Sequence, residues 1–143
     1  MKNLRPLFIL IPLALFWAAC SSDDDDNGPS ERFRLLTQTV WLSDSLLING
    51  MDASLPGGLL ESFNGEARFN EDGSGTFGEF DGTWRFASNE TELVIQTDSL
   101  PIPLPTRIHE LTAQDLKVST SLPDFDNLTN PPLQIRLTFK AKQ

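Results

Sequence analysis

The sequence is poor in the side chains that carry most enzyme chemistry. Its 143 residues include one cysteine, one histidine and no tyrosine. A single cysteine excludes an internal disulfide, and together with His109 it is too small a set for a zinc site of nitrogen and sulfur ligands. The chain also lacks the Gly-x-Ser-x-Gly segment that holds the nucleophile of many hydrolases. We therefore expect a protein that is not an enzyme and that holds neither a metal nor a cofactor.

Positive charge is also scarce. Eleven Lys and Arg residues stand against 20 Asp and Glu residues, which leaves a formal net charge of −9 at pH 7. A surface that binds nucleic acid needs an excess of Lys and Arg to neutralise phosphates, and electrostatic docking on anionic lipid needs the same excess. This composition argues against both kinds of partner.

The first 19 residues have the layout of a secretory signal peptide. Lys2 and Arg5 provide a basic start, residues 7–17 form an apolar run, and two alanines precede Cys20. The apolar run is about half as long as the roughly 20 residues that a membrane-spanning helix needs. We expect residues 1–19 to be removed on export.

The segment Ala18-Ala19-Cys20 resembles the end of a bacterial lipobox, although Trp17 stands where that pattern prefers leucine. The resemblance implies that Cys20 carries acyl chains such as palmitate and begins the mature protein. The Ser-Ser-Asp-Asp-Asp-Asp segment that follows is similar to an export signal of surface lipoproteins. It implies a cell-envelope protein that is anchored in the outer membrane through the lipid on Cys20 and exposed at the cell surface.

Two further regions follow the leader. Residues 20–30 contain the aspartate run and then Asn, Gly, Pro and Ser, which predicts a flexible acidic tether; the lipobox resemblance implies that it is lipidated at Cys20. Residues 31–143 are enough for one domain with a core of its own but not for two.

Alternation of apolar and polar residues dominates after residue 30, where helical periodicity is almost absent. Asp81-Gly82 is a strong signal for a two-residue hairpin turn. About eight short strands in succession predict an all-β fold, a small up-and-down antiparallel β-barrel whose closure removes its edges; a β-sandwich is the alternative. The expected strands cover 33–42, 45–49, 66–70, 76–80, 83–86, 92–96, 106–111, 116–119 and 133–139.

Several of these segments, in this order, resemble the bacterial lipocalin-like lipoproteins. Val40-Trp41-Leu42 resembles the opening strand of that family, and the match covers most of residues 35–120. The resemblance implies a lipocalin-like barrel over 31–143 and, for many members, no defined ligand. The other matching strings are Phe-Asn-Glu-Asp-Gly-Ser-Gly-Thr-Phe at 69–77, Gly-Thr-Trp-Arg-Phe at 82–86, Leu-Val-Ile at 93–95 and Ile-His-Glu-Leu-Thr-Ala-Gln-Asp-Leu at 108–116.

Connections in an up-and-down barrel alternate between its two ends. Short polar turns at 71–74, 88–91 and 113–115 are expected at one end, and the connections 50–58, 81–82, 98–105 and 122–132 at the other. Three of the second group are long and apolar, so we interpret that end as open or partner-facing. The alternative is that these loops fold inward as a plug. Candidate interaction residues at this end are Leu55, Leu100, Ile102, Leu104 and Phe125.

Aromatic residues at alternating positions are candidates for a cavity lining. They can also be simple core, because an eight-stranded barrel is just wide enough for side chains to fill it. Without tyrosine, such a lining offers no phenol hydroxyl to orient a polar ligand, so any ligand is expected to be lipid-like. The candidates are Phe69, Phe77, Trp84, Phe86 and Phe139.

The sequence favours a non-catalytic binding module for a small apolar ligand or a partner protein. The rival hypothesis is a structural or accessory envelope protein with a filled barrel and no ligand. The volume of any cavity distinguishes the two, since a small-ligand pocket occupies roughly 300–1,000 Å³. Separately, Asp-Ser-Leu tripeptides at Ser45 and Ser99 resemble an acceptor of bacterial O-glycosylation.

Overall fold

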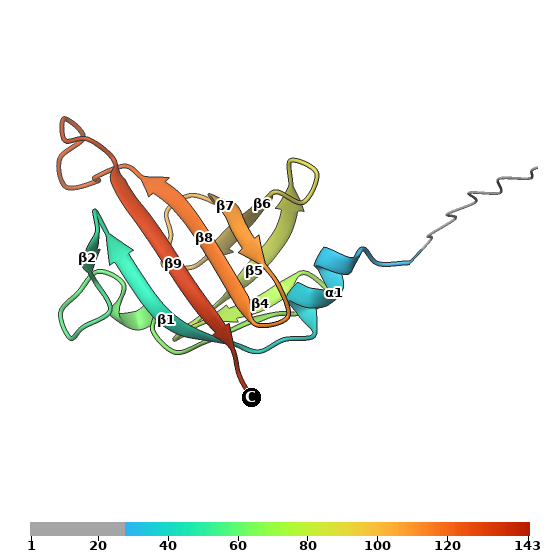
Figure 1. Ribbon diagram of the computed structural model, residues 1–143. Helices are drawn as coiled ribbons and strands as arrows, with labels where there is room; N and C mark the ends of the chain where they lie inside the picture. The colour runs from blue at the N-terminus through green and yellow to red at the C-terminus, as the bar shows by residue number, and fades with distance from the viewer. Residues whose placement is uncertain (1–27) are drawn as a thin grey trace, which may run out of the picture.

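The strand patterns produce one antiparallel sheet that closes on itself (Figure 1). The computed structural model describes residues 28–143, and in this part of the chain the sheet has nine strands. The predicted signal peptide, Cys20 and the predicted tether up to residue 27 lie outside the described residues. The strands are β1 (Trp41–Ile48), β2 (Met51–Asp52), β3 (Glu66–Phe69), β4 (Ser74–Phe77), β5 (Phe80–Ala87), β6 (Glu92–Thr97), β7 (Leu104–Leu111), β8 (Asp115–Leu122) and β9 (Leu133–Ala141).

Pairing of the first and last long strands closes the barrel. Each strand from β3 to β8 pairs with the next one in the chain, and β1 pairs with both β3 and β9. The β1–β9 ladder extends from Trp41 opposite Ala141 to Ile48 opposite Ile135. Eight strands thus form a closed antiparallel barrel, and β2 is an extra strand paired with the end of β1. The expectation of a barrel is confirmed, and the sandwich alternative is wrong because a sandwich leaves its sheets open.

Alternation along the strands separates the core from the solvent. In β8, Leu116, Val118 and Thr120 are buried, while Lys117 and Ser121 between and after them are exposed. The other strands contribute in the same way, since neighbouring side chains of a strand point to opposite faces. The closed sheet, its core and the helix that covers one end all lie within residues 28–143, so this segment contains a complete folding unit.

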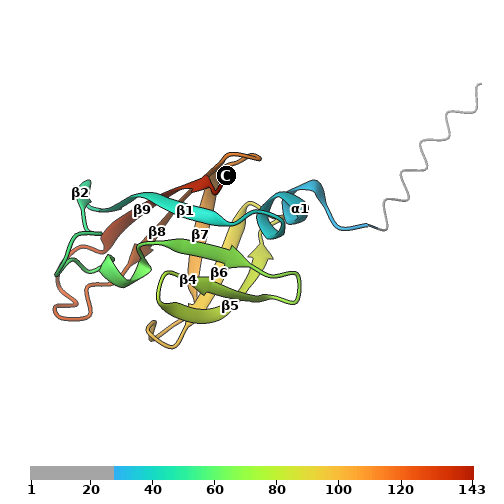
Figure 2. The same ribbon diagram turned by 90° about the horizontal axis from the view of Figure 1, so that it is seen from below.

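A short helix stands where a strand from residue 33 was expected. Helix α1 (Glu31–Thr37) begins after Ser30, whose Oγ accepts a hydrogen bond from the Phe33 amide at 3.0 Å and so caps the helix. Phe33 and Leu36 are three residues apart and therefore share one face of the helix, which packs on the barrel. The prediction of a strand was wrong because this segment buries its apolar residues at helical spacing. Figure 2 shows α1 at the end of the barrel opposite β2.

The β4–β5 turn also differs from the expectation. Gly78 and Glu79 form it, and Gly78 has a φ of 62°, a conformation that glycine adopts without strain. Asp81 and Gly82 instead lie inside β5, paired with Thr76 and Gly75. A Cβ at Gly82 would overlap the carbonyl oxygen of Gln96, so this glycine permits close approach of β6 rather than a turn.

The connections fall into the two expected groups. The turns 70–73, 88–91 and 112–114 lie at the end covered by α1, which we call the closed end. The connections 49–65, 78–79, 98–103 and 123–132 lie at the other end, the open end; its three long members are the mouth loops. In Figure 1 the helix is on the right, and loops 49–65 and 123–132 are on the left. The prediction that the three long loops share one end is confirmed.

No helix among the described residues is long and apolar enough to cross a membrane.

Trp41 is predicted to be a main support of the closed end. Its side chain is fully buried, and its Nε1–H donates a hydrogen bond to the Leu36 carbonyl at 3.2 Å. Trp41→Ala should lower the free energy of unfolding by about 3–5 kcal/mol, measured by urea denaturation of residues 21–143. The control Leu128→Ala, at an exposed loop residue, should change it by less than about 0.5 kcal/mol. Equal stability of the two variants would contradict this assignment.

Candidate functional site

The interior of the barrel is not filled at its open end. A cavity of about 580 Å³ lies between the sheet and the mouth loops, inside the range of roughly 300–1,000 Å³ of small-ligand sites. Its walls come from β3 to β9, and the end of β1 adds Ile48. Loop 49–65 folds partly inward, where Phe63 of the 3₁₀ helix η1 (Glu61–Phe63) packs on Phe80 with ring centroids 4.8 Å apart. The loops therefore narrow the mouth without plugging the barrel.

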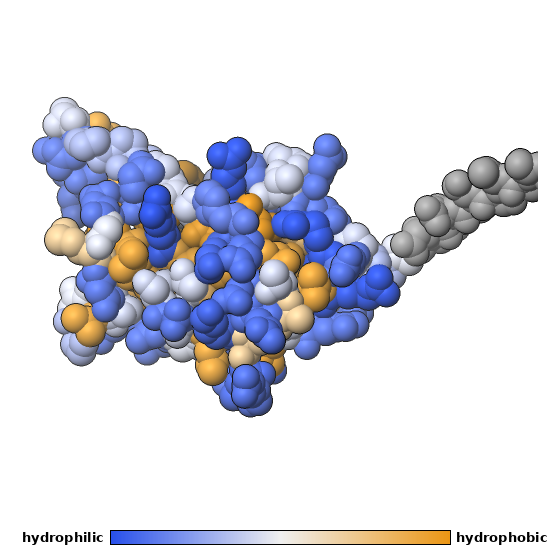
Figure 3. Space-filling view, in the orientation of Figure 1, coloured by the Kyte–Doolittle hydropathy of each residue, from blue (hydrophilic) through white to orange (hydrophobic). Residues whose placement is uncertain are grey.

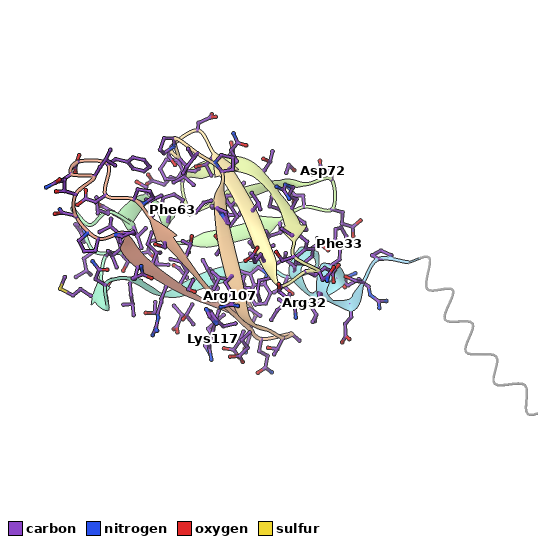
Figure 4. All side chains as sticks on the ribbon, turned by 90° about the horizontal axis from the view of Figure 1, so that it is seen from above. Arg32, Phe33, Phe63, Asp72, Arg107 and Lys117 are labelled. Atoms are coloured by element: carbon purple, nitrogen blue, oxygen red, sulfur yellow. The ribbon has the colours of Figure 1, made fainter. Side chains whose placement is uncertain are left out.

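An aromatic floor limits the cavity toward the closed end. Phe69 and Phe77 line the cavity and meet edge to face, with ring centroids 5.3 Å apart. Trp84 packs against the other side of this floor, 5.6 Å from Phe69 and 5.8 Å from Phe33 of the helix. Figure 4 shows Phe33 near the helix end and Phe63 near the loops at the opposite end. Aromatic packing and α1 thus fill one half of the barrel and leave the other half hollow.

The five predicted aromatic residues divide according to depth. Phe69, Phe77 and Phe139 line the cavity, whereas Trp84 and Phe86 do not. The last two lie toward the closed end of β5, where Trp84 donates from Nε1 to the Asn70 carbonyl at 3.0 Å. Alternation indicates which face of a strand a residue occupies but not how far along the barrel it lies.

Phe80 is a lining residue that the sequence reasoning missed. In β5 it is separated from Trp84 and Phe86 by an even number of residues, so all three side chains share the inner face. Phe80 is the first residue of the strand, at the open end. The error in placing the 81–82 turn hid this signal, because that turn assigned Phe80 to the preceding strand.

The five predicted loop residues lie at the open end, but only three reach the cavity. Leu100, Leu104 and Phe125 line it, while Leu55 and Ile102 do not. Six large apolar side chains of this end are exposed, and we call them the apolar rim. Figure 3 shows apolar residues at the surface on the loop side, on the left. The rim consists of Met51, Leu55, Leu59, Ile102, Phe125 and Leu128.

The two buried hydroxyls of the cavity wall are already hydrogen-bonded within the protein. The hydroxyl of Thr120 donates to the Pro105 carbonyl at 2.6 Å, and that of Thr106 donates to the Leu104 carbonyl at 3.2 Å. Among the described residues, no buried side-chain nitrogen or oxygen lacks a partner. A molecule inside the cavity therefore meets a chemically apolar wall.

Three carboxylates stand where the cavity opens to solvent. Glu61, Asp124 and Asp126 belong to the lining, and Glu61 Oε2 accepts from the Gly57 amide at 2.7 Å. Asp124 Oδ2 accepts from the Asn130 side-chain amide at 2.8 Å. This hydrogen bond, helped by two backbone amides, lowers the pKa of Asp124 below its ordinary value.

The other candidate residues are His109 and the two serines of the Asp-Ser-Leu tripeptides. His109 is exposed on β7, and its Nε2 lies 2.6 Å from Ser119 Oγ of β8; neither residue lines the cavity. Of the two Asp-Ser-Leu serines, Ser45 lies within β1 opposite Thr138 and away from the cavity, whereas Ser99 is exposed on a mouth loop and belongs to the cavity lining. In the described part of the chain, no group of three or more His, Cys, Asp and Glu side chains could hold a metal ion.

No protein-family model and no curated protein matches the chain. The chemistry and shape of the cavity are therefore the starting point for its function.

A matched pair of buried threonines can test the cavity. Thr106 lines it, whereas Thr97, equally buried, does not. In a Cys20→Ser background, Thr106→Cys should react with N-ethylmaleimide at least about tenfold faster than Thr97→Cys, because reaction of a buried thiol is limited by access. The modified fraction is followed by mass spectrometry under native conditions. Equal rates for the two cysteines would mean that the cavity is closed to small molecules.

Proposed function

We propose that the protein is a lipid-anchored envelope protein whose barrel holds a small apolar molecule in the cavity at its open end. The observation that carries this proposal is the cavity of about 580 Å³ at the open end, whose walls are mostly apolar and which the mouth loops border. A filled barrel without a ligand, the rival hypothesis, has no use for such a volume.

Hydration of the cavity supports an apolar ligand. A buried water needs about two to four polar partners. The wall hydroxyls of Thr106 and Thr120 already donate to backbone carbonyls, and the surrounding side chains are Phe, Leu, Ile and Val. Water in the deep part of the cavity is therefore poorly bound, and an apolar molecule can replace it at a gain of roughly 25 cal/mol per Å² of buried apolar surface.

The ionisable groups of the lining support a binding role rather than catalysis. They are the three carboxylates at the mouth, and none of them lies in the apolar depth where a bound molecule would be held. A general acid or base must be within hydrogen-bond reach of the reacting atoms. We therefore propose a non-catalytic module.

A second candidate function is docking of a partner protein on the apolar rim. Exposed apolar patches on soluble domains often mark interaction sites. Leu59 and Leu128 are each about three-quarters exposed, at 74% and 75%, and both lie on mouth loops. This reading requires no ligand, so ligand binding and rim docking can be tested separately.

The anchor and the mouth belong to opposite ends of the barrel in this proposal. Ser30 and α1 lead the chain into the closed end, while the mouth loops lie at the other end. The lipobox-like segment at Cys20 supports attachment to the membrane upstream of α1. Because the chain enters at the closed end, an anchor there leaves the mouth accessible to molecules outside that membrane.

Filling the cavity is predicted to abolish binding. Residues 21–143 should bind the neutral dye 1-aminoanthracene, and Val118→Phe should weaken this binding at least about tenfold, because Val118 lines the cavity and the larger ring occupies it. The measurement is a fluorescence titration. The control Ser121→Phe places the same ring on the outer face of β8 and should bind like the wild type. Unchanged binding by Val118→Phe would contradict the proposed site.

Native mass spectrometry tests whether a natural ligand copurifies. The protein should carry extra mass that disappears on denaturation, and Val118→Phe should not. A bare wild-type protein that also fails to bind the dye would overturn the ligand proposal and leave docking on the apolar rim as the function to test.

Lipidation is predicted to depend on Cys20 alone, because the chain has no other cysteine. In a Gram-negative host fed an alkyne-tagged palmitate, the wild type should be labelled and Cys20→Ala should not. Replacement of Asp23–Asp26 by alanine should leave the label and reduce the fraction that external protease digests on intact cells. Palmitate label on Cys20→Ala would contradict lipidation at Cys20. Unchanged surface exposure of the alanine variant would contradict the role of the aspartates as an export signal.

A further inference from the structure

Charge is distributed unevenly between the two ends of the barrel. Residues 49–65, 78–79, 98–103 and 123–132, which make the open end, contain no Lys, Arg or His. Arg32 and Arg34 lie on α1 at the closed end, and the other basic residues of the described part lie in strands or at the C-terminus. The acidic residues of the open end are Asp52, Glu61, Glu79, Asp98, Asp124 and Asp126.

The basic side chains of the strands do not neutralise these carboxylates through ion pairs. Lys117 pairs with Glu110 at 2.5 Å, and Arg68 pairs with Glu66 at 3.0 Å. The remaining two ion pairs among the described residues join Lys140 to Asp115 and Lys142 to Glu66, so none of the four ion pairs uses a carboxylate of the open-end connections. The open end therefore keeps its negative charge, and it surrounds the entrance to an apolar cavity.

The position of a ligand's polar group follows from the cavity wall. The hydroxyls of Thr106 and Thr120 in the deep wall already donate to backbone carbonyls, and the deep wall has no charged side chain among the described residues. Burial of a charged group there costs several kcal/mol without a partner. The apolar part of an amphiphile must therefore lie inside, and its head group must remain at the mouth beside Glu61, Asp124 and Asp126.

We propose that the cavity selects amphiphiles with a positively charged head group over neutral ones and rejects those with a carboxylate. This inference rests on the proposed ligand-binding function and adds the chemical class of the ligand, an alkyl amine or quaternary ammonium compound. The apolar cavity takes the alkyl chain, and the mouth carboxylates attract the ammonium. A carboxylate in the same place would face three like charges and find no basic partner on the open end.

Competition among amphiphiles of equal chain length tests this inference. Dodecyltrimethylammonium, dodecanol and dodecanoate, each below its micelle concentration, compete with 1-aminoanthracene for residues 21–143 at low salt. The ammonium should bind at least about tenfold more tightly than the carboxylate, with the alcohol between them. The difference should shrink at about 0.5 M salt, because the mouth is open to solvent and its charges are screened.

Variants identify the responsible charges. Glu61→Gln/Asp126→Asn keeps the size of both side chains and should reduce the preference for ammonium over carboxylate about threefold or more. The alcohol should bind as before, which shows that the cavity is intact. The control Glu31→Gln/Glu71→Gln removes the same charge from exposed residues of the closed end and should leave the preference unchanged. If the double variant is unstable, Asp126→Asn alone is used for the same comparison of ammonium and carboxylate affinities.

The outcomes separate this inference from the proposed function. Equal affinity for the three amphiphiles, or tightest binding of dodecanoate, would overturn the charge preference while leaving the cavity as a binding site. An unchanged preference in Glu61→Gln/Asp126→Asn would also overturn it. Failure of the dye and of all three amphiphiles to bind would overturn the proposed function itself, and the charge preference with it.

Discussion

The pairing of β1 with β9 is the contact on which the other features depend. It joins Trp41 and Ile48 to residues near the C-terminus, so the sheet has no free long edge. Closure also turns the inner face of every strand toward one enclosed volume. With β1 and β9 apart, the same side chains would line an open groove, and the apolar cavity would be exposed to water along its side.

The barrel uses its two halves differently. At the closed end, Trp41, Trp84 and Leu36 fill the interior, and α1 covers it. At the open end, the strands continue beyond the aromatic floor of Phe69 and Phe77 and enclose space instead of side chains. The packed half can therefore supply most of the free energy of folding. In the other half, apolar side chains face an empty cavity and contact no other side chains there. A hollow of this size is costly in a well-packed protein unless another molecule fills it.

Much of this arrangement follows from local patterns in the sequence. Alternation assigns Phe69, Phe77 and Phe139 to the interior, and strand counting assigns the long loops to one end. The position of a residue along the barrel axis does not follow from the sequence, because alternation with a period of two indicates only the face of the strand. For this reason Trp84 was expected to line the cavity, although it lies toward the closed end. Helix α1 was missed because seven residues with one buried leucine give a weak helical signal, and its stability comes from tertiary contact with Trp41.

The two ends of the barrel differ in charge, and this difference does not follow from the fold alone. The closed end has basic as well as acidic side chains. The mouth loops have exposed apolar residues, and their only charged side chains are carboxylates. In the proposed function, the apolar surface attracts the tail of an amphiphile whatever the charge of its head group, and the carboxylates act on the head group that remains outside. Two nonspecific forces, apolar burial and electrostatic attraction, can thus select a class of ligand when the geometry separates them along one axis. The mouth needs no shaped polar pocket for that selection, which agrees with a cavity wall in which the hydroxyls of Thr106 and Thr120 already donate to backbone carbonyls.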